Sequence, residues 1–110
     1  MDDATWIPET ALLAAKRGLA WLEQAMPEAV ERLDVERLAM HDWELCVLGQ
    51  ACGDFALMQN WLEASGLLYR EQSRWLWEHG FIHGVDRLYA DLDRAWRRVL
   101  ADRGAHDNAK

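Results

Sequence analysis

The sequence predicts a small all-α domain, a helical bundle of about five helices, two of them short. Apolar residues recur at spacings of three and four along most of the chain, as they do on one face of an α-helix. Glycine and proline divide the chain into pieces of helical length, and no useful period-2 alternation marks a strand. A length of 110 residues fits a single domain.

The first helix is expected to begin near Pro8 and to end at Pro27. Proline suits the first helical position but cannot continue a helix from within. The predicted apolar stripe of this helix is Leu12, Ala15, Leu19, Leu22 and Met26. A short turn is expected over residues 27–33, and Asp34 is expected to cap a brief segment over residues 35–40.

A buried central helix is predicted around residues 43–52, with Asp42 as its N-cap. The stretch LCVLGQACGDF, residues 45–55, is apolar in nearly every direction around this helix, which is typical of a buried helix. Gly49 weakens it by roughly 1 kcal/mol. Gln50 is polar and, if buried, must form hydrogen bonds, so we expect a backbone partner near Gly53 or in the loop over residues 80–84.

Two further helices are expected over residues 55–64 and 68–79, with Gly66 and Gly80 as their stops. The last helix has the clearest period, with the stripe Val85, Leu88, Tyr89, Leu92, Ala95, Trp96, Val99 and Leu100. The domain core is expected over residues 8–103, and residues 104–110 are expected to form a frayed tail.

The two cysteines raise the question of a metal site or a reactive thiol. On one straight helix, Cys46 and Cys52 would be separated by roughly 9 Å of rise, too far for a disulfide. With His79 and His83 they would make a Cys₂His₂ set, and the histidines have zinc-like spacing but the cysteines do not. We therefore predict no metal and interpret the cysteines as packing residues.

A thiol-dependent protein built on Cys46, with His41 and His79, is kept as an alternative. A reactive thiol needs a lowered pKa, and the apolar neighbours Leu45 and Val47 favour an inert one. None of the motifs HExxH, GxSxG, GxGxxG or the P-loop is present. We predict that the chain is not an enzyme and uses no cofactor.

Charge and composition restrict the classes of partner. The net charge of -7 opposes non-specific binding of nucleic acid. Arg94, Arg97, Arg98 and Arg103 could form a basic patch, but interspersed aspartates favour an ordinary salt-bridged face. The sequence shows neither a signal peptide nor an apolar stretch of about 20 residues, so we expect no membrane contact. Two cysteines without a secretion signal suggest reduced thiols, so we expect a cytoplasmic protein.

The seven tryptophans offer a different kind of candidate site. Most are expected in or beside the core, because indole rings bury a large area. Tryptophan is also favoured at the energetic centres of interfaces. We select Trp6, Trp21 and Trp77 as partner-binding candidates.

Part of the sequence resembles a family of small uncharacterised proteins from actinobacteria and their phages. The resemblance covers about residues 15–100 and depends mainly on CVLGQ and the following GDF, residues 46–50 and 53–55. Weaker matches are Gly18, Leu22, Pro27, Leu33, Asp34, Val35, Leu38 and the element EHGF at residues 78–81. The chain departs from the pattern at Glu23 and at Glu28-Ala29, where the family has Asp and Gly-Trp. The resemblance implies a bacterial or phage accessory protein and supplies no activity.

Together these observations predict a non-catalytic helical module that binds another protein, with a homo-oligomer left open. Two alternatives remain: the metal or thiol-dependent protein around Cys46, and an acidic, host-directed inhibitor that would bind a basic partner through its surface charge.

Overall fold

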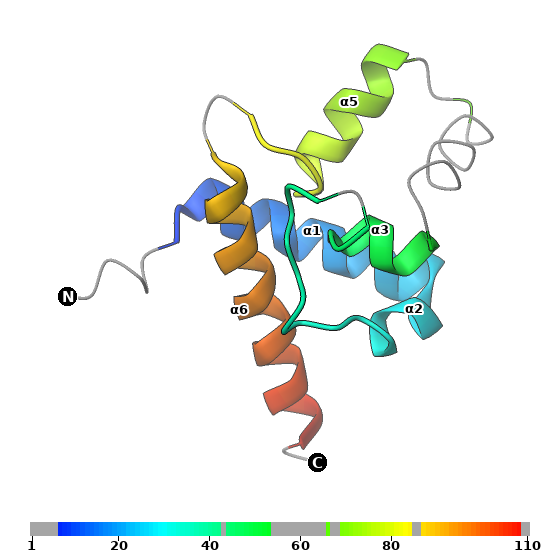
Figure 1. The fold of residues 1–110 in the computed structure, drawn as a ribbon, viewed down its shortest axis with the longest axis vertical. Helices are drawn as coiled ribbons and strands as arrows, with labels where there is room; N and C mark the ends of the chain where they lie inside the picture. The colour runs from blue at the N-terminus through cyan, green and yellow to red at the C-terminus, as the bar shows by residue number, and fades with distance from the viewer. Residues whose placement is uncertain (1–6, 43, 54–65, 67–68, 85–86, 109–110) are drawn as a thin grey trace.

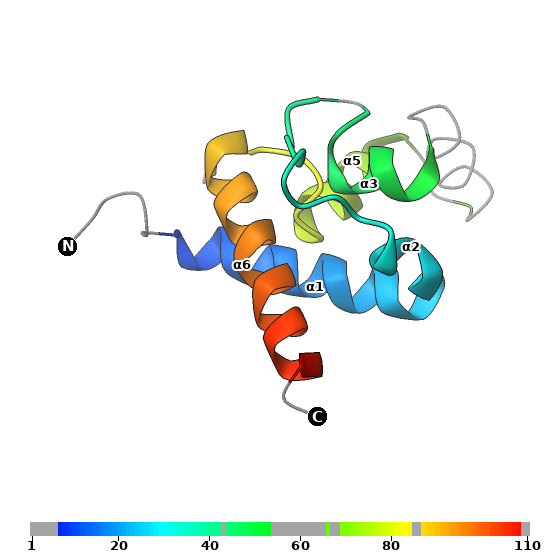
Figure 2. The ribbon, with the colours of Figure 1, turned by 60° about the horizontal axis from the view of Figure 1, so that its bottom comes forward.

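The computed structural model describes residues 7–42, 44–53, 66, 69–84 and 87–108. Within these ranges the chain forms five helices: α1 Glu9–Ala25, α2 Pro27–Glu31, α3 Val47–Cys52, α5 Tyr69–Glu78 and α6 Tyr89–Asn108. In these parts the extended structure is limited to one isolated bridge between Gly84 and Arg87. The predicted all-α fold is therefore confirmed. Figures 1 and 2 show α6 crossing α1, while α2 folds back at the end of α1.

α1 follows its predicted limits, but its buried face is richer in small residues than predicted. Pro8 precedes the helix, and Pro27 begins α2 after the single residue Met26. The buried residues are Ala11, Ala14, Ala15, Gly18, Leu19 and Leu22, whereas the predicted Leu12 and Met26 are only half-buried. A face of alanine and glycine allows neighbouring backbone to approach the helix axis closely.

The closest of these approaches lies at Gly18. A Cβ atom there would collide with the carbonyl oxygen of His79 and would lie 2.6 Å from the Trp96 ring. Gly80 meets the same helix, since a Cβ on it would lie 2.8 Å from the backbone nitrogen of Ala15. Trp96 is fully buried and donates its indole N–H to the Gly80 carbonyl at 2.7 Å. The turn after α5 is thus held between α1 and α6.

That turn ends α5 as predicted, with Gly80 in the left-handed conformation at φ 73°. The Gly80 N–H donates to the Trp77 carbonyl at 3.2 Å, and the Phe81 N–H donates to the Leu76 carbonyl at 2.8 Å. This pair of bonds is a Schellman motif, which favours glycine because of the positive φ. Gly66, the other predicted stop, also has a positive φ of 82°, but the helix predicted over residues 55–64 lies outside the described residues.

Residues 32–46 connect α2 to α3, and the described part of this connection, 32–42 and 44–46, contains no regular helix. This corrects the prediction of a helical segment over 35–40. The Asp34 carboxylate does accept bonds from the N–H groups of Glu36 and Arg37, but only a turn over residues 35–37 follows. The backbone beyond it is bound by α6 instead, because Asp93 accepts the Met40 N–H at 2.7 Å. These side-chain bonds take the place of helical ones.

Gln50 also binds this connection. Its side-chain oxygen accepts the Asp34 N–H at 2.6 Å, and its amide nitrogen donates to the carbonyls of Asp34 and Leu45 at 3.2 and 2.8 Å. A backbone-bonding role was predicted and is confirmed. The predicted partners, near Gly53 or in the 80–84 loop, were wrong.

The central helix is shorter than the predicted 43–52. Cys46 has an extended backbone (φ -69°, ψ 166°) and is the N-cap, so α3 begins at Val47. Asp42, the predicted cap, instead accepts the N–H groups of Glu44 and Leu45 in the preceding turn. Val47 and Leu48 are buried as predicted, whereas Gln50 and Cys52 are half-buried.

Both ends of α6 differ from the prediction. Leu88, part of the predicted apolar stripe, precedes the helix and is 67% exposed. Asp91 accepts its N–H at 2.9 Å and so caps the helix there. At the other end α6 continues to Asn108, past the limit of 103 predicted for the core, and residues 109–110 lie outside the described residues. The buried residues between are Leu92, Ala95, Trp96 and Val99, all on the predicted stripe.

Candidate functional site

Two of the three tryptophans selected from the sequence pack against their own chain. Trp21 is half-buried and meets Trp75 edge to face, with ring centroids 4.9 Å apart. Trp77 is also half-buried, and the Arg87 guanidinium lies 4.7 Å above its ring. Trp6 lies outside the described residues. Trp21 and Trp77 therefore contact other residues of the chain, and neither ring is fully exposed to solvent.

Cys46 has a structural position that fits packing better than reactivity. Its sulfur accepts the Gly49 N–H at 3.3 Å and so caps α3. Burial raises the pKa of the Cys46 thiol above its usual range, and this outweighs the lowering by backbone hydrogen bonds. A raised pKa favours the neutral thiol over the nucleophilic thiolate. Of its suggested partners, His41 is exposed and His79 stacks on Trp75 with centroids 4.1 Å apart.

The four residues of the weak metal hypothesis do not form a ligand set. Cys46 and Cys52 lie at the two ends of α3, and both are thiols. His79 lies at the end of α5, whereas His83 lies in the next loop against the Tyr89 ring at 4.5 Å. Among the residues that the structure describes, no three His, Cys, Asp or Glu side chains are placed to hold a metal ion.

The arginines of the possible basic patch bind groups of their own chain. Arg94 pairs with Asp91 at 2.7 Å, and Arg98 pairs with Asp102 at 3.2 Å. Arg97 donates to two backbone carbonyls of the 32–46 connection. These contacts correspond to the salt-bridged face that the sequence favoured over a phosphate-binding patch.

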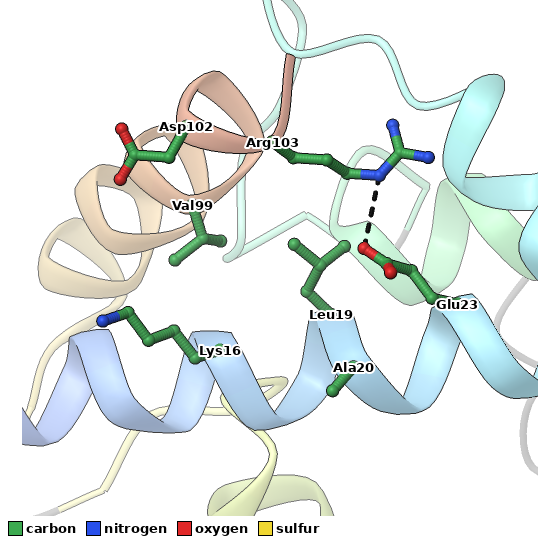
Figure 3. A pocket seen from close by; sticks show the side chains of 7 residues that line it. All are labelled: Lys16, Leu19, Ala20, Glu23, Val99, Asp102 and Arg103. Carbon is green, nitrogen blue, oxygen red and sulfur yellow. Dashed lines mark hydrogen bonds and ion pairs between the residues drawn. The ribbon is translucent and has the colours of Figure 1, made fainter. Parts of the chain in front are cut away.

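A further candidate is a hollow of about 470 Å³ between α1 and α6. Figure 3 shows the side chains that line it. Its apolar lining comes from Leu19 and Ala20 on α1 and from Val99 on α6, and its charged lining is Lys16, Glu23, Asp102 and Arg103. Leu19 and Val99 are buried, whereas Ala20 is exposed. The hollow thus has an apolar centre and a charged rim.

The rim charges alternate around this hollow. Lys16 and Asp102 lie toward one end of the view in Figure 3, and Glu23 and Arg103 lie toward the other. Arg103 bonds Glu23 at 3.2 Å and also reaches Glu31 of α2 at 2.6 Å. These bonds connect α6 to both α1 and α2 and form one wall of the hollow.

A second hollow, of about 300 Å³, lies between the α1–α2 corner and α3 and is lined by Ala25, Met26, Pro27, Glu28, Ala29, Arg32 and Ala51. Ala51 is near the end of α3, after which residues 54–65 are outside the described ranges. The hollow between α1 and α6 is the larger of these two and is the candidate site.

Sequence reasoning missed this hollow because it followed only the buried stripe of α1. Leu13 and Ala20 are seven residues apart and so share one face of the helix. Both are apolar, whereas the neighbouring Lys16 and Glu23 are charged. Leu13 is 47% exposed. Two apolar residues on the polar face of a helix were the signal that could have indicated it.

Comparison with known proteins gave no match: no protein-family model, curated protein or solved structure is significantly similar to the chain. The resemblance to the actinobacterial and phage family stays a prediction. Within the described ranges, none of the helices is both long and apolar enough to cross a membrane.

Proposed function

We propose that the chain is a non-catalytic helical module, acting in the cytoplasm of a bacterium or an infecting phage's host, that docks a protein on the hollow between α1 and α6. The observation that carries this proposal is the apolar centre of the hollow, formed by Leu19, Ala20 and Val99 inside a charged rim. Protein interfaces share this arrangement of an apolar core and a polar rim. An amphipathic helix laid in a groove is one recurrent way to fill it.

The chemistry of the lining supports binding over catalysis. The seven lining residues include no histidine, cysteine or hydroxyl side chain. Of the two carboxylates, Glu23 is bonded to Arg103 and Asp102 is bonded to Arg98. Groups engaged in this way position a partner more readily than they exchange protons with a substrate.

The two alternatives gain less support from the described residues. Cys46 is half-buried, burial raises the pKa of its thiol, and its sulfur caps α3, which fits packing rather than thiol chemistry. An acidic inhibitor would need a negative docking face, whereas the hollow balances Lys16 and Arg103 against Glu23 and Asp102. Capture of a basic protein that is lost on adding salt would favour the inhibitor.

The docking proposal is tested by placing a large cation on the hollow. Ala20→Arg obstructs the apolar centre, and Ala101→Arg makes the same change at an exposed alanine of α6 that does not line the hollow. The tagged full-length chain and both variants are used to capture proteins from the source organism, followed by mass spectrometry. Circular dichroism and thermal unfolding check that both variants are folded.

We expect a protein that the unchanged chain and Ala101→Arg both retain and that Ala20→Arg loses. Equal retention by both folded variants would place the docking surface elsewhere. A chain that retains nothing and sediments as a monomer would also contradict the proposal.

A further inference from the structure

The outer face of α1 carries opposite charges on the two sides of Ala20. Lys16 and Arg17 lie about one turn before Ala20, and Glu23 lies about one turn after it. All four residues are exposed. Within the described part of the chain, the side chains of Lys16 and Arg17 form no ion pair, so their charges are available to a partner.

The opposite end of this face has a negative excess. Glu23 and Glu31 both bond to Arg103, so two carboxylates meet one guanidinium there. Glu23 is 46% exposed and Glu31 is 66% exposed, whereas Arg103 is 27% exposed. The carboxylates are therefore the more accessible part of the group, and a partner meets a positive end and a negative end about 10 Å apart along α1.

A surface with one positive and one negative end complements itself when it is turned around. If a second α1 lies antiparallel across the first with Ala20 at the crossing, each Lys16–Arg17 end faces the Glu23 end of the other copy. A two-fold axis produces this contact twice, as in an isologous dimer. A parallel arrangement would bring like charges together.

We propose that the occupant of the hollow is α1 of a second copy of this chain, packed antiparallel about a two-fold axis near Ala20. The inference rests on the proposed docking function and names its partner. The small side chain of Ala20 lets the two helices approach, and the exposed Leu13 of each copy extends the apolar contact. Since the apolar area is modest, the dimer is weak and forms at high concentration.

Charge reversal with a mixing step tests the antiparallel contact. Variant one is Lys16→Glu with Arg17→Glu, and variant two is Glu23→Lys; each alone places like charges at both ends of the dimer. Mixed together, they restore opposite charges at both ends. Analytical ultracentrifugation of the full chain from about 10 μM to about 1 mM measures association. Arg74→Glu, on an 81% exposed side chain of α5, is the control for an added negative charge.

We expect the unchanged chain and Arg74→Glu to show rising mass toward a dimer, each reversed variant to stay monomeric, and the mixture to dimerise. A monomeric unchanged chain over this range overturns the inference, as does a mixture that stays monomeric. If the chain is monomeric while Ala20→Arg still abolishes capture of another protein, the docking function stands and only the second copy is excluded.

Discussion

Gly18 shows how one missing side chain determines the packing of three segments. Its Cα faces the His79 carbonyl and the Trp96 ring, so α1, the turn after α5 and α6 meet at one point. Trp96 is fully buried there, and its indole N–H is satisfied by Gly80. A tryptophan in the core without such a bond would leave a polar group unsatisfied.

We predict that Gly18→Ala lowers the free energy of unfolding by about 1–3 kcal/mol, because an added methyl group has to displace backbone rather than a flexible side chain. Gly104→Ala is the matched control. It is also in a helix, but no atom lies within 4 Å of the new Cβ, and we expect a gain of up to about 1 kcal/mol. Urea unfolding measures both, and similar values for the two variants would refute the close contact at Gly18.

At the level of elements, the connection over residues 32–46 is held by side chains from α3 and α6. Gln50 binds its two ends, and Arg97 donates to the carbonyls of Val35 and Leu38 at 2.8 and 2.6 Å. The planar fork of arginine suits two acceptors in this geometry, whereas lysine has a single point charge. Where the structure describes it, the connection thus has a defined path without a regular helix of its own.

We predict that Arg97→Lys destabilises this connection by about 1 kcal/mol and speeds hydrogen exchange of the amides over residues 35–40. Arg98→Lys changes the neighbouring arginine, whose partner is Asp102 in the same helix, and should alter stability by less than about 0.5 kcal/mol. Hydrogen exchange followed by mass spectrometry measures the local effect. Unchanged exchange over 35–40 in Arg97→Lys would show that the fork does not hold the connection.

The helices that could be predicted are those with a long apolar period or a proline or glycine at their ends. Pro8 and Pro27 bounded α1, and Gly80 ended α5, because these residues act through their own backbone. The start of α3 was missed, since Asp42 and Cys46 are both able to cap and only the fold decides between them. The hollow was missed for a similar reason: it depends on how α6 crosses α1.

On the scale of the whole molecule, Arg103 connects parts of the chain that are far apart in sequence. It joins α6 to Glu23 of α1 and to Glu31 of α2, 80 and 72 residues away. Ion pairs near the surface stabilise little individually, but this guanidinium serves two carboxylates and is only 27% exposed. It also forms one wall of the proposed docking hollow.

We predict that Arg103→Gln lowers the free energy of unfolding by about 1 kcal/mol and that the loss becomes smaller in high salt, because salt screens exposed charges. Arg74→Gln removes an exposed pair with Glu78 inside α5 and should cost less than about 0.5 kcal/mol. Thermal unfolding at low and high sodium chloride compares them. A cost for Arg103→Gln that does not depend on salt would argue for lost packing instead.

The packing of α1 on α6 has a consequence for how the protein is made. During synthesis α1 leaves the ribosome before the other described helices, yet Gly18 cannot meet Trp96 until α6 has been translated. Until then its alanine and glycine face remains uncovered, and the nascent chain lacks its main core. Folding therefore waits for the last helix, as expected where the decisive contacts join distant parts of a sequence.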